Sequence, residues 1–503
     1  MQYESIAAVD LGSNSFRLEV GRVVDDQIYT LDSLKESVRL ASGLQADKSL
    51  DQASQERALI ALSRFGERIR GLPPEAVRAV ATNALRVAKN ATAFLVEAEL
   101  ALGFPIEIIA GREEARLIYI GAVHSLPASD ERRLVFDIGG GSTEFIIGDR
   151  MKPLCLESLF MGCVSYSLRF FPDGVIDKRR MLDAQMAAAK EVSLIAHAYQ
   201  KTGWGEAIGS SGSAKAIAEI LEQNGLNPDG VSGITRLGLD RLCALMIRHK
   251  RMEALPLQGV KADRIPVLPG GVAIMSAILD TLGIQHLTYA DGALRLGVLY
   301  DLLGRFHHHD MRTATVKQFQ RRYQVESGQA QRVAETALQI FHDLMGVKLR
   351  KQEDLEKDRQ FIDWAASLHE IGLSIAHTGY HKHGAYVLSY ADMPGFSRMD
   401  QARLALLVLC HRGKLNKVDA LNREDVTWRQ ILSLRLASIL HRARFEGGAP
   451  DLQARETVNG FTLQLPAAWL DENPMTAAAL RDESEVWEEA GFRLRIRATR
   501  KSS

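Results

Sequence analysis

Two short segments of the chain combine an acid at the end of an apolar run with glycine and hydroxyl residues. The first reads IAAVDLGSNSFR over residues 6–17, and the second reads LVFDIGGGSTE over residues 134–144. Glycines in such turns can adopt positive φ and let backbone N–H groups point together at an anion. Asp10 and Asp137, at the two strand ends, are placed to hold a metal ion or to orient water. The chemistry indicated is that of phosphate groups held from two sides.

Each acid is followed by a second apolar run, residues 18–20 in the first copy and 145–147 in the second. This pattern predicts a strand, a tight turn and another strand. Neither copy is a Walker P-loop, because no Gly-Lys-Ser/Thr follows and the chain enters a strand instead of a helix. One such turn alone would as readily be a glycine-rich hairpin that binds nothing. The spacing between Asp10 and Asp137 suits one copy in each half of a duplicated α/β protein that handles phosphate.

Two further segments offer groups that bind or polarise phosphate. Residues 207–215 (AIGSSGSAK) lead into the helical run 216–223, whose N-terminus would attract an anion, although a serine N-cap is the simpler interpretation. Residues 108–118 (IIAGREEARLI) end a strand and open a helix with Glu113 and Glu114. Acids in a first helical turn commonly serve the helix dipole. Hydrolysis of a phosphoanhydride also needs a base that orients water, and a carboxylate at this junction suits that role.

Two arginines stand close to these segments in the sequence. Arg17 follows the first turn, and Arg86 ends the segment 82–86 (TNALR) after another predicted strand. A guanidinium group binds phosphate through two parallel hydrogen bonds. Either arginine taken alone would as readily pair with a surface carboxylate.

Together the segments resemble the exopolyphosphatase / guanosine pentaphosphate phosphatase (Ppx/GppA) family. The resemblance rests on six segments in a fixed order: 10–16, 82–86, 111–116, 137–144, 209–213 and 291–297. They span residues 1–300, which makes the match far more specific than any single glycine motif. It implies an α/β fold of the actin-like, sugar-kinase and Hsp70 type, in which two lobes enclose the active site.

The same resemblance implies roles for individual residues. Glu114 takes the place of the catalytic base, and Asp137 and Glu144 are further catalytic carboxylates on the metal and water side. Metal binding falls to Asp10, Asp137 and Glu144, with Mg²⁺ expected, Mn²⁺ as its alternative and K⁺ as a further candidate ion. The expected phosphate-binding residues are Gly12, Ser13, Asn14, Arg17, Arg86, Gly139, Gly140, Gly141, Ser142, Thr143, Gly209, Ser210, Ser211, Gly212 and Ser213.

The C-terminal third resembles the long members of the family. Residues 365–373 (AASLHEIGL) and 381–386 (HKHGAY) are similar to a helical HD-type phosphohydrolase domain. Glu370 stands where a metal-binding HD domain has Asp, so we expect a degenerate scaffold for substrate binding and dimerisation. His342 and His411 are candidate ligands, although ordinary buried or surface histidines are the simpler interpretation.

Composition is that of an ordinary globular protein. Of 503 residues, 46% are hydrophobic and 25% are charged, and 62 basic residues balance 62 acidic ones. Binding of a polyanion must therefore depend on local placement of charge, and we expect no DNA partner. The chain has no apolar run long enough to span a membrane and no signal-like N-terminus, so we expect a cytoplasmic protein, with peripheral membrane association left open. Four scattered cysteines indicate neither a zinc site nor a disulfide framework.

Periodicity predicts helices at 52–70 and 91–102, strands at 77–81 and 106–110, and strands near the C-terminus at 457–465 and 491–496. We expect four parts: lobe I (1–125), lobe II (126–305), a mainly α-helical HD-like domain (311–445) and a small α+β part (446–503) that packs with it. Basic clusters at 178–180, 248–251, 348–351 and 493–501 are individually more typical of solvated faces. The His307–His309 run is more typical of a solvated linker than of a metal site.

The leading hypothesis from the sequence is an exopolyphosphatase that releases terminal orthophosphate from linear inorganic polyphosphate by metal-assisted attack of water. The alternative is the same chemistry on guanosine pentaphosphate, giving the tetraphosphate, or both activities in one homodimeric protein. A sugar kinase would also need adenosine recognition and a base near an acceptor hydroxyl. A binding module without activity is disfavoured by the complete carboxylate set, Asp10, Glu114, Asp137 and Glu144.

Overall fold

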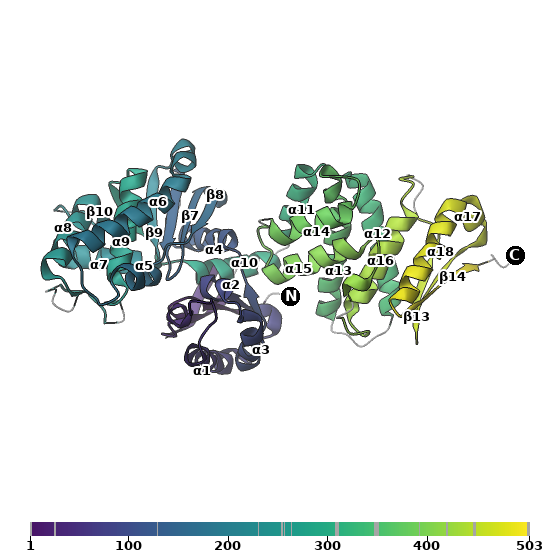
Figure 1. The fold of residues 1–503 in the computed structure, drawn as a ribbon, viewed down its shortest axis with the longest axis horizontal. Coiled ribbons are helices and arrows are strands. Elements are labelled where there is room, and N and C mark those ends of the chain that lie inside the picture. The colour runs from purple at the N-terminus through teal and green to yellow at the C-terminus, as the bar shows by residue number, and fades with distance from the viewer. Residues whose placement is uncertain are drawn as a thin grey trace. The chain divides into compact units, whose positions relative to one another are not determined.

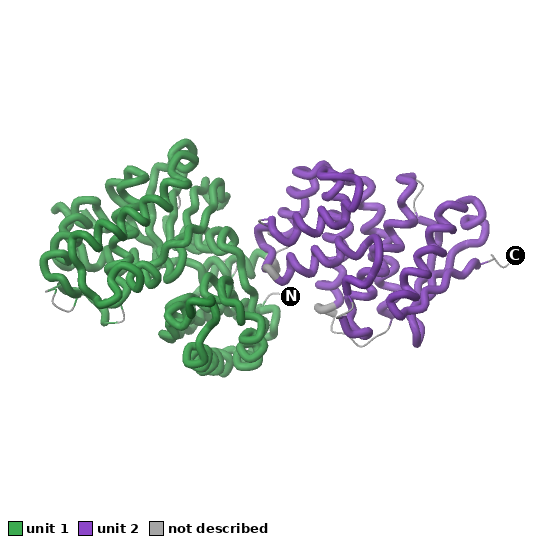
Figure 2. Tube along the Cα trace, viewed as in Figure 1, with its two compact units in different colours: residues 1–310 green, residues 311–503 purple. Residues whose placement is uncertain are grey.

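The computed structural model describes residues 3–24, 27–127, 129–229, 231–252, 255, 257–262, 264–306, 311–346, 352–391, 393–418, 421–445 and 449–499. The chain divides into two compact units, residues 1–310 and 311–503 (Figure 2). The His307–His309 run, the cluster 348–351 and the end of the cluster 493–501 lie outside the described residues.

Unit 1 contains two sheets built on the same plan (Figure 1). The first has the strand order β3-β2-β1-β4-β5, in which β1, β2 and β3 are antiparallel neighbours and β4 and β5 run parallel to β1. The strands are β1 (Ser5–Leu11), β2 (Phe16–Val24), β3 (Gln27–Glu36), β4 (Val77–Ala81) and β5 (Ile106–Ile108). The predicted strands at 77–81 and 106–110 are therefore confirmed, the second in shortened form.

The second sheet has the order β10-β11-β9-β6-β7-β8. Its strands β6, β7 and β8 are antiparallel neighbours, and β9 and β11 run parallel to β6, so it repeats the first sheet with β10 added at one edge. The strands are β6 (Arg133–Ile138), β7 (Thr143–Asp149), β8 (Lys152–Leu159), β9 (Glu206–Ser210), β10 (Ile234–Thr235) and β11 (His286–Tyr289).

The duplication places the two glycine-rich turns at equivalent points. Each turn joins the first two strands of its sheet, and in each an acid stands one residue before the last pair of the ladder. Asp10 lies opposite Arg17 in one sheet, and Asp137 lies opposite Glu144 in the other. The predicted strand–turn–strand units and the duplicated α/β plan are confirmed by this topology, which is the arrangement expected of an actin-like fold.

Helices cover both faces of the first sheet. Ile6, Ala7, Ala8 and Val9 of β1 are all buried, as in parallel sheets enclosed by helices. One face packs on α1 (Gln52–Ile69) and α3 (Ala91–Leu102), which match the predicted helices 52–70 and 91–102. The N-cap Asp51 accepts a hydrogen bond from the backbone N of Ser54 at 2.7 Å, which fixes where α1 begins.

The other face of this sheet packs on α4 (Gly111–His124) and α10 (Leu294–Phe306), two helices that lie against each other. Helix α4 also contacts β7 and β8, whereas α10 contacts β1 and β2, so the pair lies between the two sheets. Residues 294–306 fall within the range expected for lobe II, but α10 lies with the strands of the first sheet. The remaining helices of unit 1 are α2 (Asn83–Val87), α5 (Cys163–Phe170), α6 (Lys178–Thr202), α7 (Ser211–Gln223), α8 (Arg236–His249) and α9 (Leu268–Leu282).

Unit 2 consists of helices followed by a small sheet. The helices are α11 (Met311–Arg322), α12 (Ser327–Met345), α13 (Gln352–Leu368), α14 (Tyr380–Tyr390), α15 (Arg398–Cys410), α16 (Val426–Leu440), α17 (Ala467–Glu472) and α18 (Pro474–Glu489). The sheet has the order β12-β13-β14, with β12 (Gln453–Thr457), β13 (Gly460–Pro466) and β14 (Arg493–Thr499). One hydrophobic cluster runs through helices and sheet. No helix in the described part of the chain has the length and apolar character needed to cross a membrane.

Candidate active site

The two glycine-rich turns lie in the wall of a cavity of about 510 Å³ in unit 1. A cavity of this size can enclose a small ligand. The predicted site residues that line it are Asp10, Gly12, Ser13, Asn14, Arg17, Glu114, Asp137, Gly139, Gly140, Ser142, Ser211, Gly212 and Ser213. Segments far apart in the sequence therefore converge on one cavity.

The second turn packs closely against the first turn and against α2. A Cβ atom added to Gly140 would lie 3.1 Å from Cβ of Ser13 and 3.6 Å from the backbone N of Asn14. A Cβ atom on Gly141 would lie 2.5 Å from Oδ1 of Asn83. None of the turn glycines, all of which the structure describes, has a positive φ, so the expected reason for glycine was wrong. Close approach, and not left-handed backbone, requires glycine here.

Four carboxylates gather at this site. Asp10, Glu114 and Asp137 line the cavity, while Glu144 does not and lies opposite Asp137 in the sheet. Glu114, Asp137 and Glu144 are 7%, 9% and 1% exposed. Ser210 Oγ donates a hydrogen bond to Asp137 Oδ2 at 2.6 Å. Asp10 Oδ1, in contrast, is shielded from solvent and accepts no hydrogen bond from the described residues.

Burial raises the pKa of these carboxyl groups. The pKa of Glu114 is raised to about 7 by burial, opposed by the Arg86 guanidinium and reinforced by the charges of Asp10 and Asp137. Burial raises the pKa of Asp137 to about 6 and that of Glu144 well above its usual value. A carboxylate with a pKa near neutrality is suited to accept a proton from water.

Glu114 reaches the cavity from the first turn of α4. Arg86 Nη1 donates to Glu114 Oε2 at 3.1 Å and to the backbone carbonyl of Ile109 at 2.9 Å. This pair of bonds ties the carboxylate to the strand end that precedes α4. Arg86 itself does not line the cavity, so in this structure it orients Glu114, although we expected it to bind phosphate.

Five other predicted site residues also do not line the cavity: Gly141, Thr143, Glu144, Gly209 and Ser210. Thr143 Oγ1 donates to the backbone carbonyl of Met161 at 2.6 Å. Glu144 Oε1 accepts a hydrogen bond from Ser158 Oγ at 2.8 Å. Gly209 lies on β9, where a Cβ atom would come within 2.8 Å of Cβ of Ala214. These residues support the lining from behind.

Six basic side chains line the cavity: Arg17, Lys35, Lys215, Lys261, Arg264 and Arg295. The sequence singled out Arg17; Lys215 and Arg295 lie inside the quoted segments 207–215 and 291–297, and Lys35, Lys261 and Arg264 carried no signal. The guanidinium of Arg264 lies across the backbone at Gly212, where an added Cβ atom would fall 1.8 Å from Nη2. Arg295 Nε donates to Glu19 Oε2 at 3.0 Å. Lys215, Lys261 and Arg295 also have acidic partners, which are Asp291, Glu219 and Glu19 respectively. Other guanidinium groups of the lining, those of Arg17 and Arg264, can bind phosphate oxygens.

A metal ion would need the substrate to complete its coordination. Among the described residues, no group of three His, Cys, Asp or Glu side chains is arranged to hold a metal ion. Mg²⁺ commonly takes one or two carboxylates and fills its other positions with water and phosphate oxygens. The three carboxylates expected to hold the ion, Asp10, Asp137 and Glu144, do not form such a group of three. Asp10 and Asp137 both line the cavity from equivalent strands, so these two could take that role.

Comparison with known proteins assigns the family. Residues 19–306 match the Ppx/GppA phosphatase family, and residues 311–484 match Ppx/GppA phosphatase, domain III. The chain belongs to the Ppx/GppA phosphatase family. The predicted resemblance is confirmed, and membership makes this Ppx/GppA protein a phosphoanhydride hydrolase.

The sequences of similar proteins align with nearly the full length of this Ppx/GppA chain. A guanosine-5'-triphosphate,3'-diphosphate pyrophosphatase of Aeromonas hydrophila is 38% identical over 97% of this chain and 98% of that protein. A protein of the same name from Photobacterium profundum is 36% identical over 97% of each chain.

Solved structures match unit 1. The crystal structure of the Aquifex aeolicus family member has a TM-score of 0.51 and 25% identity, and covers 60% of this chain and 99% of that one. An exopolyphosphatase from Cytophaga hutchinsonii shares the fold, with a TM-score of 0.53 at 24% identity over 60% of this chain and 98% of that one.

Domain III of this Ppx/GppA protein contains a second cavity, of about 560 Å³. His369 and His411 line it with ring centroids 5.4 Å apart, and Nδ1 of each contacts a backbone carbonyl. Arg444 Nη2 donates to Glu370 Oε1 at 2.6 Å, so the carboxylate that would complete a metal site is engaged by a cation. His342, the other candidate ligand, does not line this cavity.

Proposed function

We propose that this protein releases the terminal phosphate of a linear phosphoanhydride chain by attack of water, with Glu114 as the base. The observation that carries the proposal is the position of Glu114, a buried carboxylate with a pKa near neutrality that lines a cavity between two facing glycine-rich turns. The turns and the arginines would hold the phosphate chain, while Glu114 orients and deprotonates water behind the terminal phosphorus. Arg86 fixes the direction of this carboxylate.

We propose Mg²⁺ as the cofactor, with Mn²⁺ as its alternative. Asp10 and Asp137 would hold the ion, and phosphate oxygens of the substrate would complete its shell. The ion would supply positive charge to the leaving phosphate and would favour the charged forms of the surrounding carboxylates. Glu144, which is buried behind Asp137 and bonded by Ser158, would act by orienting its neighbours.

Guanosine 5'-triphosphate 3'-diphosphate is our first candidate substrate, with linear inorganic polyphosphate second. The sequence alone led to polyphosphate as the first candidate, although the residues of unit 1 suit both substrates. The change rests on the names of two relatives that match over nearly the full length of this chain. We also propose that unit 2 is a degenerate HD-type domain and that the protein is a homodimer. Metal analysis of the purified protein tests the first of these proposals, and light scattering tests the second.

Parallel single-turnover assays on the two substrates test this function. We expect orthophosphate release from both, with a higher kcat/KM for the guanosine nucleotide, and loss of release in Glu114→Gln. The proposal would be contradicted if neither substrate released orthophosphate, or if the protein transferred phosphate from ATP to a sugar.

A further inference from the structure

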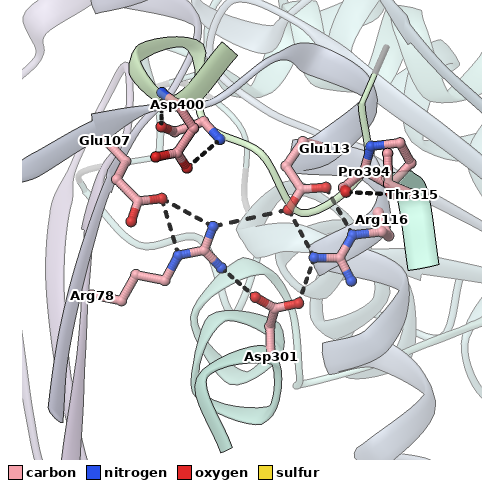
Figure 3. A network of polar contacts seen from close by, with 9 residues as sticks. Arg78, Glu107, Glu113, Arg116, Asp301, Thr315, Pro394 and Asp400 are labelled. Carbon is pink, nitrogen blue, oxygen red and sulfur yellow. Dashed lines mark hydrogen bonds and ion pairs between the residues drawn. The ribbon is translucent and has the colours of Figure 1, made fainter. Parts of the chain in front are cut away.

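Figure 3 shows a cluster of charged side chains that includes Glu113, the neighbour of Glu114 in the sequence. None of the cluster's members lines the cavity. These members come from four elements of unit 1: Arg78 on β4, Glu107 on β5, Glu113 and Arg116 on α4, and Asp301 on α10. Arg78, Glu113 and Arg116 are at most 3% exposed. The function proposed above uses none of these groups, so their burial needs an explanation of its own.

Asp301 stands at the centre of the cluster. Arg78 Nη1 donates to Asp301 Oδ2 at 2.7 Å, and Arg116 Nη2 donates to Asp301 Oδ1 at 2.5 Å. Arg116 also holds Glu113 through two hydrogen bonds of 2.7 Å. Figure 3 shows Asp301 between the two arginines, with Glu113 reaching Arg116 from the same helix. One continuous set of bonds therefore joins β4, α10 and the first turn of α4.

Stability alone is a weak reason for these buried charges. Removing charged groups from water is costly, and well-packed apolar side chains of similar volume hold elements together at least as well. What the charged groups add is direction, because a guanidinium and a carboxylate joined by two parallel bonds have little freedom of rotation.

The backbones of α4 and α10 also touch. A Cβ atom on Gly297 would lie 1.7 Å from the carbonyl oxygen of Leu117, and one on Gly121 would lie 2.0 Å from that of Ala293. The glycines set how closely the helices approach. Two contacts hold the end of α4 that carries Glu114 against its neighbours. Arg116 donates to Asp301 on α10, and Arg78 Nη2 on β4 lies 3.9 Å from Glu113 Oε1.

We propose that Asp301, Arg116 and Glu113 position Glu114 for catalysis, as residues that act through it and do not touch the substrate. This inference rests on the proposed function. Glu113 and Glu114 are consecutive and point about 100° apart around the helix, so fixing the rotation of the helix at Glu113 also fixes the direction in which the Glu114 side chain leaves the backbone. Glu114 then meets Arg86 at hydrogen-bonding distance. A displacement of about 1 Å at a catalytic group can cost about a hundredfold in rate.

Asp301→Asn tests the proposal, because Asp301 lies on a different helix and does not line the cavity. We expect kcat to fall by about ten- to a hundredfold while KM changes by less than about threefold. The acidic limb of the pH profile should move to higher pH, because Glu114 loses part of the Arg86 contact that favours its charged form.

Glu483→Gln is the matched control. Arg435 donates to both oxygens of Glu483, at 2.5 and 2.7 Å, so this buried pair has the same chemistry but belongs to unit 2, whereas α4 belongs to unit 1. The control should lose thermal stability as Asp301→Asn does, yet keep the kcat and pH profile of the unmodified protein. If Asp301→Asn does not fold, Glu113→Asp keeps the charge, shortens the side chain and should lower kcat in the same direction.

A kcat and pH profile within about twofold of the unmodified protein in a folded Asp301→Asn or Glu113→Asp variant would overturn the inference. Glu114→Gln, measured in the same series, separates this outcome from failure of the proposed function. An inactive Glu114→Gln beside a fully active Asp301→Asn rejects only the positioning role, whereas an active Glu114→Gln rejects the base itself.

Discussion

The substitution Glu114→Gln tests the base through activity and stability together. Glutamine keeps the size of the side chain and an oxygen that can accept the Arg86 hydrogen bond, but it cannot take a proton from water. Loss of a general base commonly costs at least about a hundredfold, so orthophosphate release at saturating substrate and Mg²⁺ should fall by about that much or more. Circular dichroism would verify that the variant is folded.

The effect on stability follows from the pKa of Glu114, which is raised from its usual 4.5 to about 7, chiefly by burial. Between these pH values the folded protein keeps a proton that the unfolded chain has released, so this group's contribution to stability is present at low pH and is lost as the pH rises toward 7. The full difference corresponds to about 3 kcal/mol of unfolding free energy. Since glutamine is neutral at every pH, Glu114→Gln should be the more stable protein at pH 8, by up to about 3 kcal/mol, and by less than about 1 kcal/mol at pH 5.

Urea unfolding of both proteins at pH 5 and pH 8, without metal or substrate, measures this difference. A buried base that lowers stability predicts an inactive but more stable variant, with a difference in unfolding free energy that grows as the pH rises. Near-normal turnover in a folded Glu114→Gln protein would refute the assignment. A gap independent of pH would refute the reasoning about the pKa.

The remaining predictions concern the metal and the two units. Chelator should abolish activity and Asp137→Asn should weaken or abolish the response to Mg²⁺; full metal-free turnover would contradict the proposed carboxylate pair. His369→Ala should leave the metal requirement unaltered, and a changed requirement would indicate a functional metal site in domain III. Arg493, Arg495 and Arg497 alternate along β14, are exposed and have no acidic partner among the described residues. Replacing all three by Ser should weaken binding of long polyphosphate, reduce its salt dependence and leave more intermediate chain lengths on a gel, whereas equal processivity would assign this face another role.

The parts of the site that could be predicted from the sequence are those with a local pattern. An acid followed by glycine and hydroxyl residues between two apolar runs predicts each turn, and the repetition of this pattern predicts the two sheets. Arg264 had no such signal, because it lies between α8 and α9 outside any helix or strand and meets Gly212 only through the fold. The sequence predicted that Arg86 binds phosphate, whereas in the structure its guanidinium donates a hydrogen bond to the buried carboxylate of Glu114. Partners chosen by long-range packing cannot be inferred from spacing along the chain.

Glu113 and Glu114 illustrate the same limit most sharply. In the sequence they are equivalent acids in a first helical turn, and either could merely serve the helix dipole. In the structure Glu113 is neutralised by Arg116, while Glu114 faces the cavity beside other carboxylates and has a raised pKa. The rotation of about 100° between neighbours on a helix separates an ion-paired acid from a candidate base. The way α4 is held against β4 and α10 decides which of the two glutamates faces the cavity. The charge cluster around Asp301, which joins these elements, therefore bears on catalysis as well as on the fold.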